Sequence, residues 1–170
     1  MLILGIDPGL RKTGWGIVES VGSRLSYVAS GLICADPKAS LPIRLAYLHE
    51  NVMDVILTWR PESAAVEETF VNKNPASALK LGQARGVLLA VPALCGLETA
   101  EYSANTIKKS VTGAGHAAKM QVGAMIQMLL PGARAENGGQ ISEDEADALA
   151  VAITHAHHRQ SMMRRVPATL

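Results

Sequence analysis

The sequence predicts an α/β protein in which a mixed sheet carries helices on both faces. Two observations lead to this prediction. Three strand-like runs come first, joined by short turns, and helix-like and strand-like runs then alternate along the rest of the 170 residues. This order is typical of an antiparallel meander continued by parallel strands with helical crossovers. A chain of this length is expected to form one domain with a substantial core.

The meander is predicted from residues 2–7, 14–20 and 24–34. The first run, LILGID, is almost wholly apolar, as expected for a strand that is buried on both faces. The other two, GWGIVES and RLSYVASGLIC, are rich in β-branched and aromatic residues. Gly22 and Ser23 separate them, which predicts a short hairpin.

A helical period begins after Ser40, which is the expected N-cap. Apolar side chains then recur every three or four positions, at Leu41, Leu45, Leu48, Val52, Val55 and Trp59. Pro61 ends this helix, and SAAVEE at 63–68 reads as a buried strand. The remaining expected elements are helices near 76–94, 103–111 and 117–130, a strand near 97–102, and a last helix that starts at Ser142. Glu145, three residues later, completes a capping-box pattern there.

The composition excludes several classes of protein. No apolar run approaches the ~18 residues of a membrane span, so we expect no membrane partner. Met1 leads straight into the first strand, which leaves no room for a signal peptide. Two cysteines are too few for a disulfide framework, and a cytoplasmic location fits these features. The net charge of +1 does not by itself indicate a nucleic-acid partner.

Carboxylates end two of the predicted strands. Asp7 ends the first strand, and Glu67 and Glu68 end the fourth. If these strands are parallel neighbours, Asp7 and one of the two glutamates lie together at one edge of the sheet, where sites form in open α/β folds. The spacing alone does not say which glutamate this is.

More carboxylates begin the last helix. Asp144 and Asp147 share a helix face, and so do Glu143 and Asp147. That face continues with apolar residues, so it is expected to point at the sheet. The helix dipole favours acids in a first turn, which accounts for Glu143 and Asp144 but less well for Asp147, and not at all for Asp7. Local spacing does not choose between Glu143 and Asp144.

Carboxylates that converge repel one another and raise one another's pKa. Divalent hard cations remove this repulsion, and Mg²⁺ prefers carboxylate oxygens. Two such ions ~4 Å apart can hold the attacking and leaving oxygens of a phosphodiester displacement. The acids therefore indicate metal-dependent phosphate chemistry.

Four segments resemble the successive motifs of the RuvC family of bacterial Holliday-junction resolvases: GIDPGLRKTGWG, AVEETFVNKNPASALKLGQARG, KKSVTGAGHAAKMQV and DEADALAVAITH. The resemblance covers nearly the whole chain in the same order. It implies a ribonuclease H-like three-layer sandwich with a five-stranded mixed sheet over residues 1–158, followed by a short flexible tail at 159–170. By motif match, the family's four metal-binding acids are Asp7, Glu67, Asp144 and Asp147.

The resemblance also implies a reaction. The family hydrolyses DNA phosphodiesters with a metal-activated water and leaves a 5′-phosphate, and Asp7 would bridge two Mg²⁺ ions, for which Mn²⁺ can substitute. A homodimer nicks two strands of like polarity symmetrically across a four-way DNA junction, in homologous recombination and DNA repair. The implied partner is the RuvA–RuvB branch-migration complex.

The resemblance points to further DNA-binding residues. Phe70, the only phenylalanine, matches a family aromatic and is expected to stack on an unpaired base. Lys108 and Lys119 match basic positions near the scissile phosphate, and Lys119 also begins a helix whose N–H groups favour anions. The other basic residues expected to contact DNA are Lys73, Lys80 and Arg85.

Small residues recur every four positions along the second helix, at Ala78, Gly82, Gly86 and Ala90. The corresponding family helix helps to form the dimer, so we expect this stripe at or near a homodimer interface. The histidines are expected to be structural: His116 as a helix cap, and His155, His157 and His158 on the last helix.

Two other functions compete with this interpretation. GIDPGLRKTGWG also resembles the first phosphate loop of actin-like ATPases and sugar kinases, but those proteins need two such domains and give the acids after Ser142 no role. A ribonuclease H-like nuclease that acts on RNA is the closer alternative, although such proteins are shorter and lack the LKLGQARG block. A junction-binding protein without activity has little support, because all four acidic positions are filled.

Overall fold

The computed structural model describes residues 1–68, 74–134 and 139–165. It contains one five-stranded sheet in the order β3-β2-β1-β4-β5. The strands are β1 (Leu2–Asp7), β2 (Lys12–Val21), β3 (Arg24–Cys34), β4 (Ser63–Glu68) and β5 (Glu98–Ser103). β1 is antiparallel to β2 and parallel to β4, and β4 is parallel to β5. The predicted mixed sheet, with its meander at one side, is confirmed.

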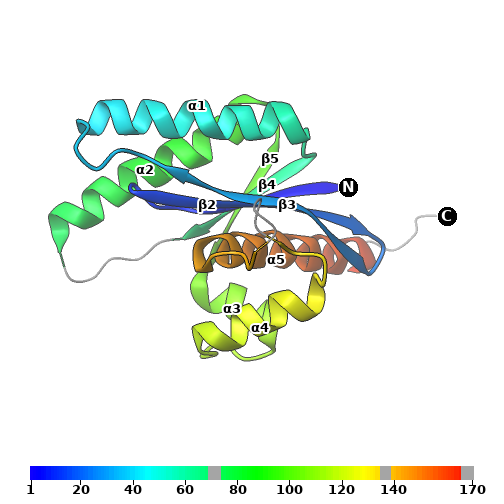
Figure 1. The fold of residues 1–170 in the computed structure, drawn as a ribbon. Helices are drawn as coiled ribbons and strands as arrows, with labels where there is room; N and C mark the ends of the chain where they lie inside the picture. The colour runs from blue at the N-terminus through cyan, green and yellow to red at the C-terminus, as the bar shows by residue number, and fades with distance from the viewer. Residues whose placement is uncertain (69–73, 135–138, 166–170) are drawn as a thin grey trace.

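Helices cover both faces of the sheet (Figure 1). α1 (Leu41–Trp59) and α2 (Pro75–Leu94) lie on one face, and the other face carries α3 (Ala104–Thr112), α4 (Lys119–Leu129) and α5 (Glu143–Arg165). The helix boundaries agree with the sequence analysis to within two residues, except at the end of α5. There the helix continues to Arg165, well into the segment predicted as a tail, and 166–170 lie outside the described residues.

Of the two expected N-caps, Ser40 is confirmed and His116 is wrong. The N-cap of α4 is Ala118 and not His116, and the backbone N–H of Ala118 is satisfied by Oε1 of Gln121 at 2.9 Å. Ser40 does occupy the N-cap position of α1, but its side chain makes no capping hydrogen bond. The sequence predicted where these helices begin better than it predicted which side chains cap them.

Side chains alternate between two cores along each strand. In β1, Ile3 belongs to the core beneath α5, whereas Leu4 and Ile6 belong to the core beneath α1 and α2. In β4, Ala65 faces α5 and Val66 faces the other way. This alternation decides which layer each carboxylate at a strand end joins.

α5 packs unusually close to the sheet because glycines line its path. A Cβ atom at Gly5 would overlap the backbone of Ala148, and one at Gly14 would overlap the backbone oxygen of Asp144. Gly5 and Asp7 are adjacent in register to Gly16 and Gly14 across the β1–β2 pair. The sequence pattern GIDPG…GWG therefore creates a flat surface on which the first half of α5 rests.

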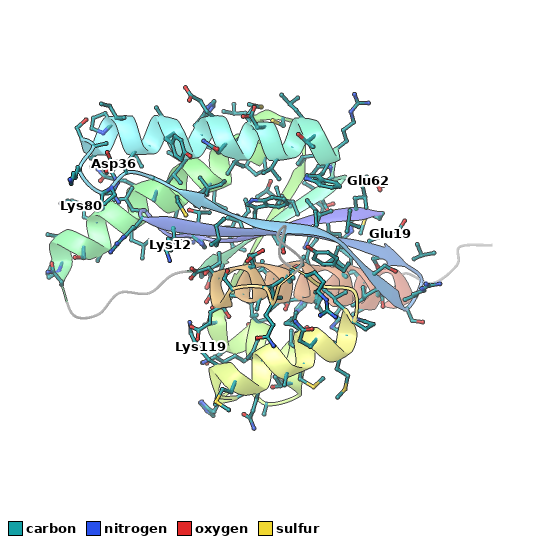
Figure 2. All side chains as sticks on the ribbon, viewed as in Figure 1. Lys12, Glu19, Asp36, Glu62, Lys80 and Lys119 are labelled. Atoms are coloured by element: carbon teal, nitrogen blue, oxygen red, sulfur yellow. The ribbon has the colours of Figure 1, made fainter. Side chains whose placement is uncertain are left out.

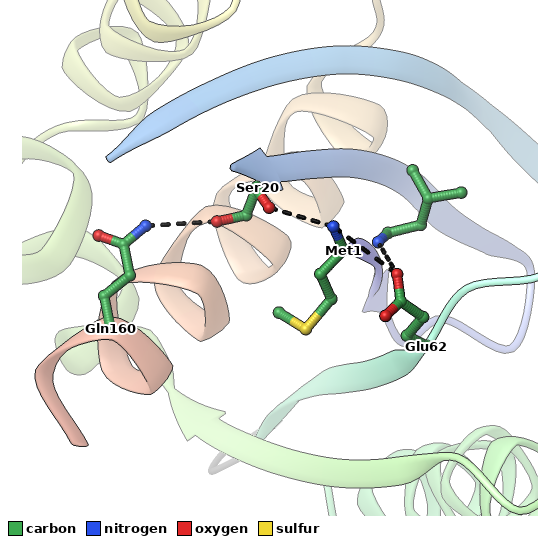
Figure 3. Close-up of polar contacts among 5 residues, drawn as sticks. Met1, Ser20, Glu62 and Gln160 are labelled. Atoms are coloured by element: carbon green, nitrogen blue, oxygen red, sulfur yellow. Dashed lines mark hydrogen bonds and ion pairs between the residues drawn. The ribbon is translucent and has the colours of Figure 1, made fainter. Parts of the chain in front are cut away.

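At the end of the sheet where β1 begins, polar groups pair with one another (Figure 3). The Met1 ammonium lies 3.6 Å from Oε1 of Glu62, and the same oxygen accepts the N–H of Leu2 at 2.9 Å. Gln160 near the end of α5 donates to Ser20 Oγ at 3.3 Å. In the part of the chain that the structure describes, no helix combines the length and apolarity needed to cross a membrane.

Candidate active site

Carboxylates lie at the opposite end of the sheet, where β1 and β4 end. β1 and β4 run parallel and end there, at Asp7 and Glu68. Because side chains alternate, Glu67 lies on the same face as Ala65, toward α5, and Glu68 lies on the face of α1 and α2. Asp7 also faces α5, two residues beyond Gly5. The structure thus brings Glu67, and not Glu68, to the side of Asp7.

α5 adds two more acids from above this face. Gly14 pairs with Asp7 and lies directly under the backbone of Asp144, so the first turn of the helix approaches the end of β1. The charge of Asp144 is close enough to raise the pKa of Asp7, and so is that of Asp147. Glu143 points elsewhere: its side chain is 83% exposed and forms an ion pair with Lys119.

Burial and neighbouring negative charges destabilise the charged forms of Asp7, Glu67 and Asp147. Burial, followed by the charges of Glu67, Asp147 and Asp144, raises the pKa of Asp7 to about 8. Burial and the charge of Asp147 raise the pKa of Glu67 to about 7. Burial also raises the pKa of Asp147. Such shifts indicate a site whose negative charge is only partly compensated, which is typical of functional positions.

Two lysines lie beside the acids. Lys119 Nζ is 3.3 Å from Oδ2 of Asp147 and 3.7 Å from Oε2 of Glu143, and these acids raise its pKa. The charge of Lys108 lowers the pKa of Glu67 against the larger effect of burial. Both lysines line a small pocket together with Glu67 and Asp147, floored by Ile107 and Val122. A substrate phosphate in this pocket would meet two ammonium groups.

The other predicted DNA-binding residues lie farther along α2 or outside the described residues. Lys80 is exposed on α2, and Figure 2 shows it at the same end of the molecule as Lys12 and Lys119, with Glu19 and Glu62 at the opposite end. Arg85 forms an ion pair with Glu101 on β5. Phe70 and Lys73 fall in the segment 69–73, which the structure does not describe.

The donor set fits a hard divalent cation. All four side chains are carboxylates, the ligand type that Mg²⁺ prefers, and a cation between them would offset the repulsion that contributes to the raised pKa values of Asp7 and Glu67. Within residues 1–68, 74–134 and 139–165, no three His, Cys, Asp or Glu side chains are already arranged as a metal-binding group. The Lys119 ammonium, which contacts Asp147, provides part of the positive charge.

The histidines of α5 make structural contacts. His155 is 2% exposed, its Nδ1 lies 2.9 Å from the Tyr102 hydroxyl, and burial lowers its pKa to about 4. Nδ1 of His157 lies 3.1 Å from the hydroxyl of Ser110 on α3. His158 packs its ring against Tyr102. These contacts tie α5 to β5 and α3, two or more turns away from Asp147.

Sequence analysis missed one acid near the site. Glu145 is 5% exposed, and its carboxylate accepts hydrogen bonds from Ser30 Oγ at 2.9 Å and from the Ser142 N–H at 2.8 Å. The capping-box pattern predicted only the contact with Ser142. Ser30 lies on β3, 115 positions away, and no local signal links the two.

A five-stranded mixed sheet of this order, with carboxylates from β1, β4 and the last helix at one edge, defines a ribonuclease H-like nuclease fold. Comparisons with known proteins then identify the family. The family model described as "Crossover junction endodeoxyribonuclease RuvC" matches residues 3–155. The chain therefore belongs to the RuvC family.

Individual relatives agree with this assignment. A crossover junction endodeoxyribonuclease RuvC from Paramagnetospirillum magneticum is 57% identical over 164 residues, which are 96% of each chain. One from Rhodospirillum rubrum is 55% identical over 159 residues, 94% of this chain and 91% of the relative. Among solved structures, T. thermophilus RuvC in complex with a Holliday junction substrate superposes with a TM-score of 0.86 at 31% identity, over 95% of this chain and 96% of the other. Metal-dependent DNA cleavage is the chemistry of this family, and the actin-like and RNA-directed alternatives lose their support.

Proposed function

We propose that this protein resolves four-way DNA junctions by Mg²⁺-dependent nicking of two strands of like polarity. The observation that carries the proposal is the convergence of four carboxylates at the end of β1, with the pKa of Asp7 raised to about 8. The membership of the chain in the RuvC family and its superposition on a relative bound to a Holliday junction support the choice of substrate.

Asp7, Glu67, Asp144 and Asp147 would hold the metal. Two ions among these oxygens would activate a water and stabilise the charge that develops on the leaving oxygen. Each acid has to be ionised to serve as a ligand, so the raised pKa values of Asp7 and Glu67 couple metal binding to proton release.

Lys119 and Lys108 would hold the scissile phosphate. Both ammonium groups line the pocket that also contains Glu67 and Asp147. The Lys119 ammonium, which is 67% exposed and lies 3.3 Å from Oδ2 of Asp147, would be within reach of a phosphate oxygen beside the metal-binding acids. Lys80 and Arg85 on α2, with Phe70 and Lys73 outside the described residues, would contact the arms or the open crossover of the junction.

A homodimer through α2 would place two such sites for symmetric cleavage. Ala78 is half-buried and Gly82, Gly86 and Ala90 are exposed, and a Cβ added to Gly82 or Gly86 would meet no atom within 4 Å. These glycines are thus not explained by packing on the sheet. We expect Gly86→Leu to convert a dimer into a monomer in sedimentation velocity; an intact dimer would contradict this assignment of the interface.

The remaining parts of the proposal concern the chain as a whole. The nuclease domain would include residues 1–158 together with the rest of α5, which ends at Arg165. The protein would act in the cytoplasm, in recombination and repair, and would receive junctions from the RuvA–RuvB branch-migration complex.

The test is a nicking assay on a labelled, mobile four-way junction with Mg²⁺ or with EDTA, beside an Asp7→Asn control. The expected result is paired, symmetric, ligatable nicks that require Mg²⁺, also form with Mn²⁺, and disappear in the variant. A linear duplex and an RNA–DNA hybrid of the same sequence serve as controls for structure. Nicking that is equally fast on the linear duplex would contradict junction specificity, and tight binding without nicks on a randomised junction would contradict catalysis.

A further inference from the structure

Glu145 is a buried acid that the proposed chemistry does not use. It lies between Asp144 and Asp147 in the sequence, yet it is 5% exposed and belongs to a different contact network. A carboxylate buried in this way is costly unless hydrogen bonds satisfy it. Each of its two oxygens accepts one bond, Oε1 from Ser30 and Oε2 from the Ser142 N–H.

The network connects the first turn of α5 to strand β3. Ser30 is itself 3% exposed, and its hydroxyl lies 3.2 Å from that of Tyr27, which donates to the carbonyl oxygen of Arg134 at 2.8 Å. Two residues of β3 therefore hold the chain at Arg134 and at Glu145, on both sides of the start of α5. At the same turn, the N–H of Glu145 is satisfied by Ser142 Oγ at 3.3 Å.

The direction of this contact around the helix axis matters. Successive residues of a helix are about 100° apart, so Glu145 is roughly 100° from Asp144 and roughly 160° from Asp147. Asp144 and Asp147 are only about 60° apart and face the end of β1. A hydrogen bond from β3 to the other side of the helix thus resists rotation of α5 about its axis.

We infer that Glu145 is a positioning residue that, through Ser30, fixes the rotation of α5 and so the placement of the metal-binding pair Asp144 and Asp147. The inference rests on the proposed function of those two acids. A carboxylate lies about 6 Å from the helix axis, so a rotation of about 10° moves it by roughly 1 Å. A displacement of that size is enough to weaken a metal site or to slow catalysis by about 100-fold.

Gly14 complements this contact. The glycine lets the backbone of Asp144 rest on β2 and sets the height of the helix, but contact with a flat surface does not set its rotation. The hydrogen bond between Ser30 and Glu145 adds a constraint on rotation from the neighbouring strand, at the turn that carries Asp144 and Asp147. In this way, the two buried polar groups act on the site without touching substrate or metal.

The inference is tested with Ser30→Ala and Glu145→Gln in the full chain. The first readout is the dissociation constant of Mn²⁺ in the absence of DNA, measured from the EPR signal of free Mn²⁺. We expect about tenfold weaker binding in each variant, the usual effect of removing a group that orients a metal ligand. The Mg²⁺ concentration for half-maximal nicking should rise by the same factor, with the rate at saturating Mg²⁺ within about threefold of wild type. The double variant should be no weaker than the weaker single variant, because both changes remove one contact.

Val52→Ala is the matched control for stability. Val52 is 1% exposed on α1, in the opposite layer of the fold. This variant should lose as much melting temperature as the Glu145 variant while Mn²⁺ binding stays unchanged. If Ser30→Ala and Glu145→Gln also keep their Mn²⁺ affinity within about twofold and lose only melting temperature, the positioning role is wrong. A wild-type protein that binds Mn²⁺ but nicks no junction would overturn the proposed function instead, and the Mn²⁺ comparison would still decide the role of Glu145.

Discussion

The polar side chains at the two ends of α5 differ in their surroundings. At its C-terminal half, His155, His157 and Gln160 each have a hydrogen-bond partner on a neighbouring element, and the edge beside them is closed by Met1 and Glu62. At its N-terminal end, Asp144 and Asp147 meet Asp7 and Glu67, and burial and mutual repulsion raise the pKa values of three of these acids.

The C-terminal half of α5 contributes to stability, whereas its N-terminal end carries the candidate site. His155, His157 and Gln160 at the C-terminal half contact β5, α3 and β2, so they hold α5 on the sheet. The acids at the N-terminal end repel one another instead. The glycine-lined surface and the contact between Glu145 and Ser30 hold the helix in place above them. Uncompensated charge at a well-positioned site is what a protein that recruits cations is expected to maintain.

The largest effect is expected from Asp7→Asn. Nicking of a four-way junction should fall by about 10³-fold or more, since the variant lacks the acid whose pKa is raised by the charges of all three others. In EDTA, however, the variant should be more stable than wild type by about 1–2 kcal/mol, because a neutral amide relieves burial and repulsion. Urea denaturation with and without Mg²⁺ checks this. Lower stability of Asp7→Asn than of wild type in EDTA would show that the Asp7 carboxylate does not destabilise the folded protein.

Gly14→Ala should damage both properties. The added Cβ would overlap the backbone oxygen of Asp144, so α5 has to shift, at a cost of about 1–3 kcal/mol and about 100-fold in nicking rate. Gly123→Ala on α4 is the matched control, because nothing lies within 4 Å of its added Cβ. The control should keep its activity and gain up to about 1 kcal/mol in unfolding free energy. Equal behaviour of the two variants would contradict the close packing of α5.

The two ends should also respond to pH with opposite signs. The pKa values of Asp7 and Glu67, about 8 and about 7, lie above their ordinary 3.8 and 4.5. The folded state therefore binds protons more tightly, and stability falls as pH rises from about 4 until both acids are ionised in the folded protein near pH 8. The pKa of His155, about 4, lies below its ordinary 6.5, so stability falls as pH drops from 6.5 toward 4.

Urea denaturation in EDTA at about pH 6.5, 7.3 and 8 measures the first of these effects. The unfolding free energy should decrease by up to about 1.4 kcal/mol per pH unit for each proton released. Saturating Mg²⁺ should remove this decrease, and Asp7→Asn should reduce it. A flat profile in EDTA would mean that the acids are ionised without difficulty in the folded protein.

The smallest change in stability is expected from Glu62→Gln, at the end of the sheet where β1 begins. The Glu62 side chain is 63% exposed, so loss of its ion pair with the Met1 ammonium should cost less than about 1 kcal/mol. Thermal denaturation measures the change, and the Mg²⁺ dependence of nicking should stay as in wild type. A change in Mg²⁺ dependence would show that the two ends are coupled.

Much of this protein could be predicted from residue patterns. The order of strands and helices follows from local periodicity and from turns such as Gly22–Ser23, where the structure has Gly22 at a φ of 58°. The candidate acids follow from their places at strand ends and in the first turn of the last helix. The N-cap position of α1 followed as well, but that of α4 did not, because α4 begins after an alanine whose N–H is satisfied by Gln121 from within the helix.

The sequence by itself determined the strand and helix order, the edge of the sheet where the acids gather, and a short set of candidates there. Residue spacing left Glu67 and Glu68 open, and the family resemblance favoured Glu67. The tertiary structure supplies the physical reason, because the pleat sends neighbours to opposite faces and its phase depends on which core each strand joins. The close approach of α5 over Gly14 and the burial of Glu145 against Ser30 were decided by the tertiary structure alone. Both are contacts between elements far apart in sequence, and the short-range patterns of a chain carry no record of which distant surface will meet them.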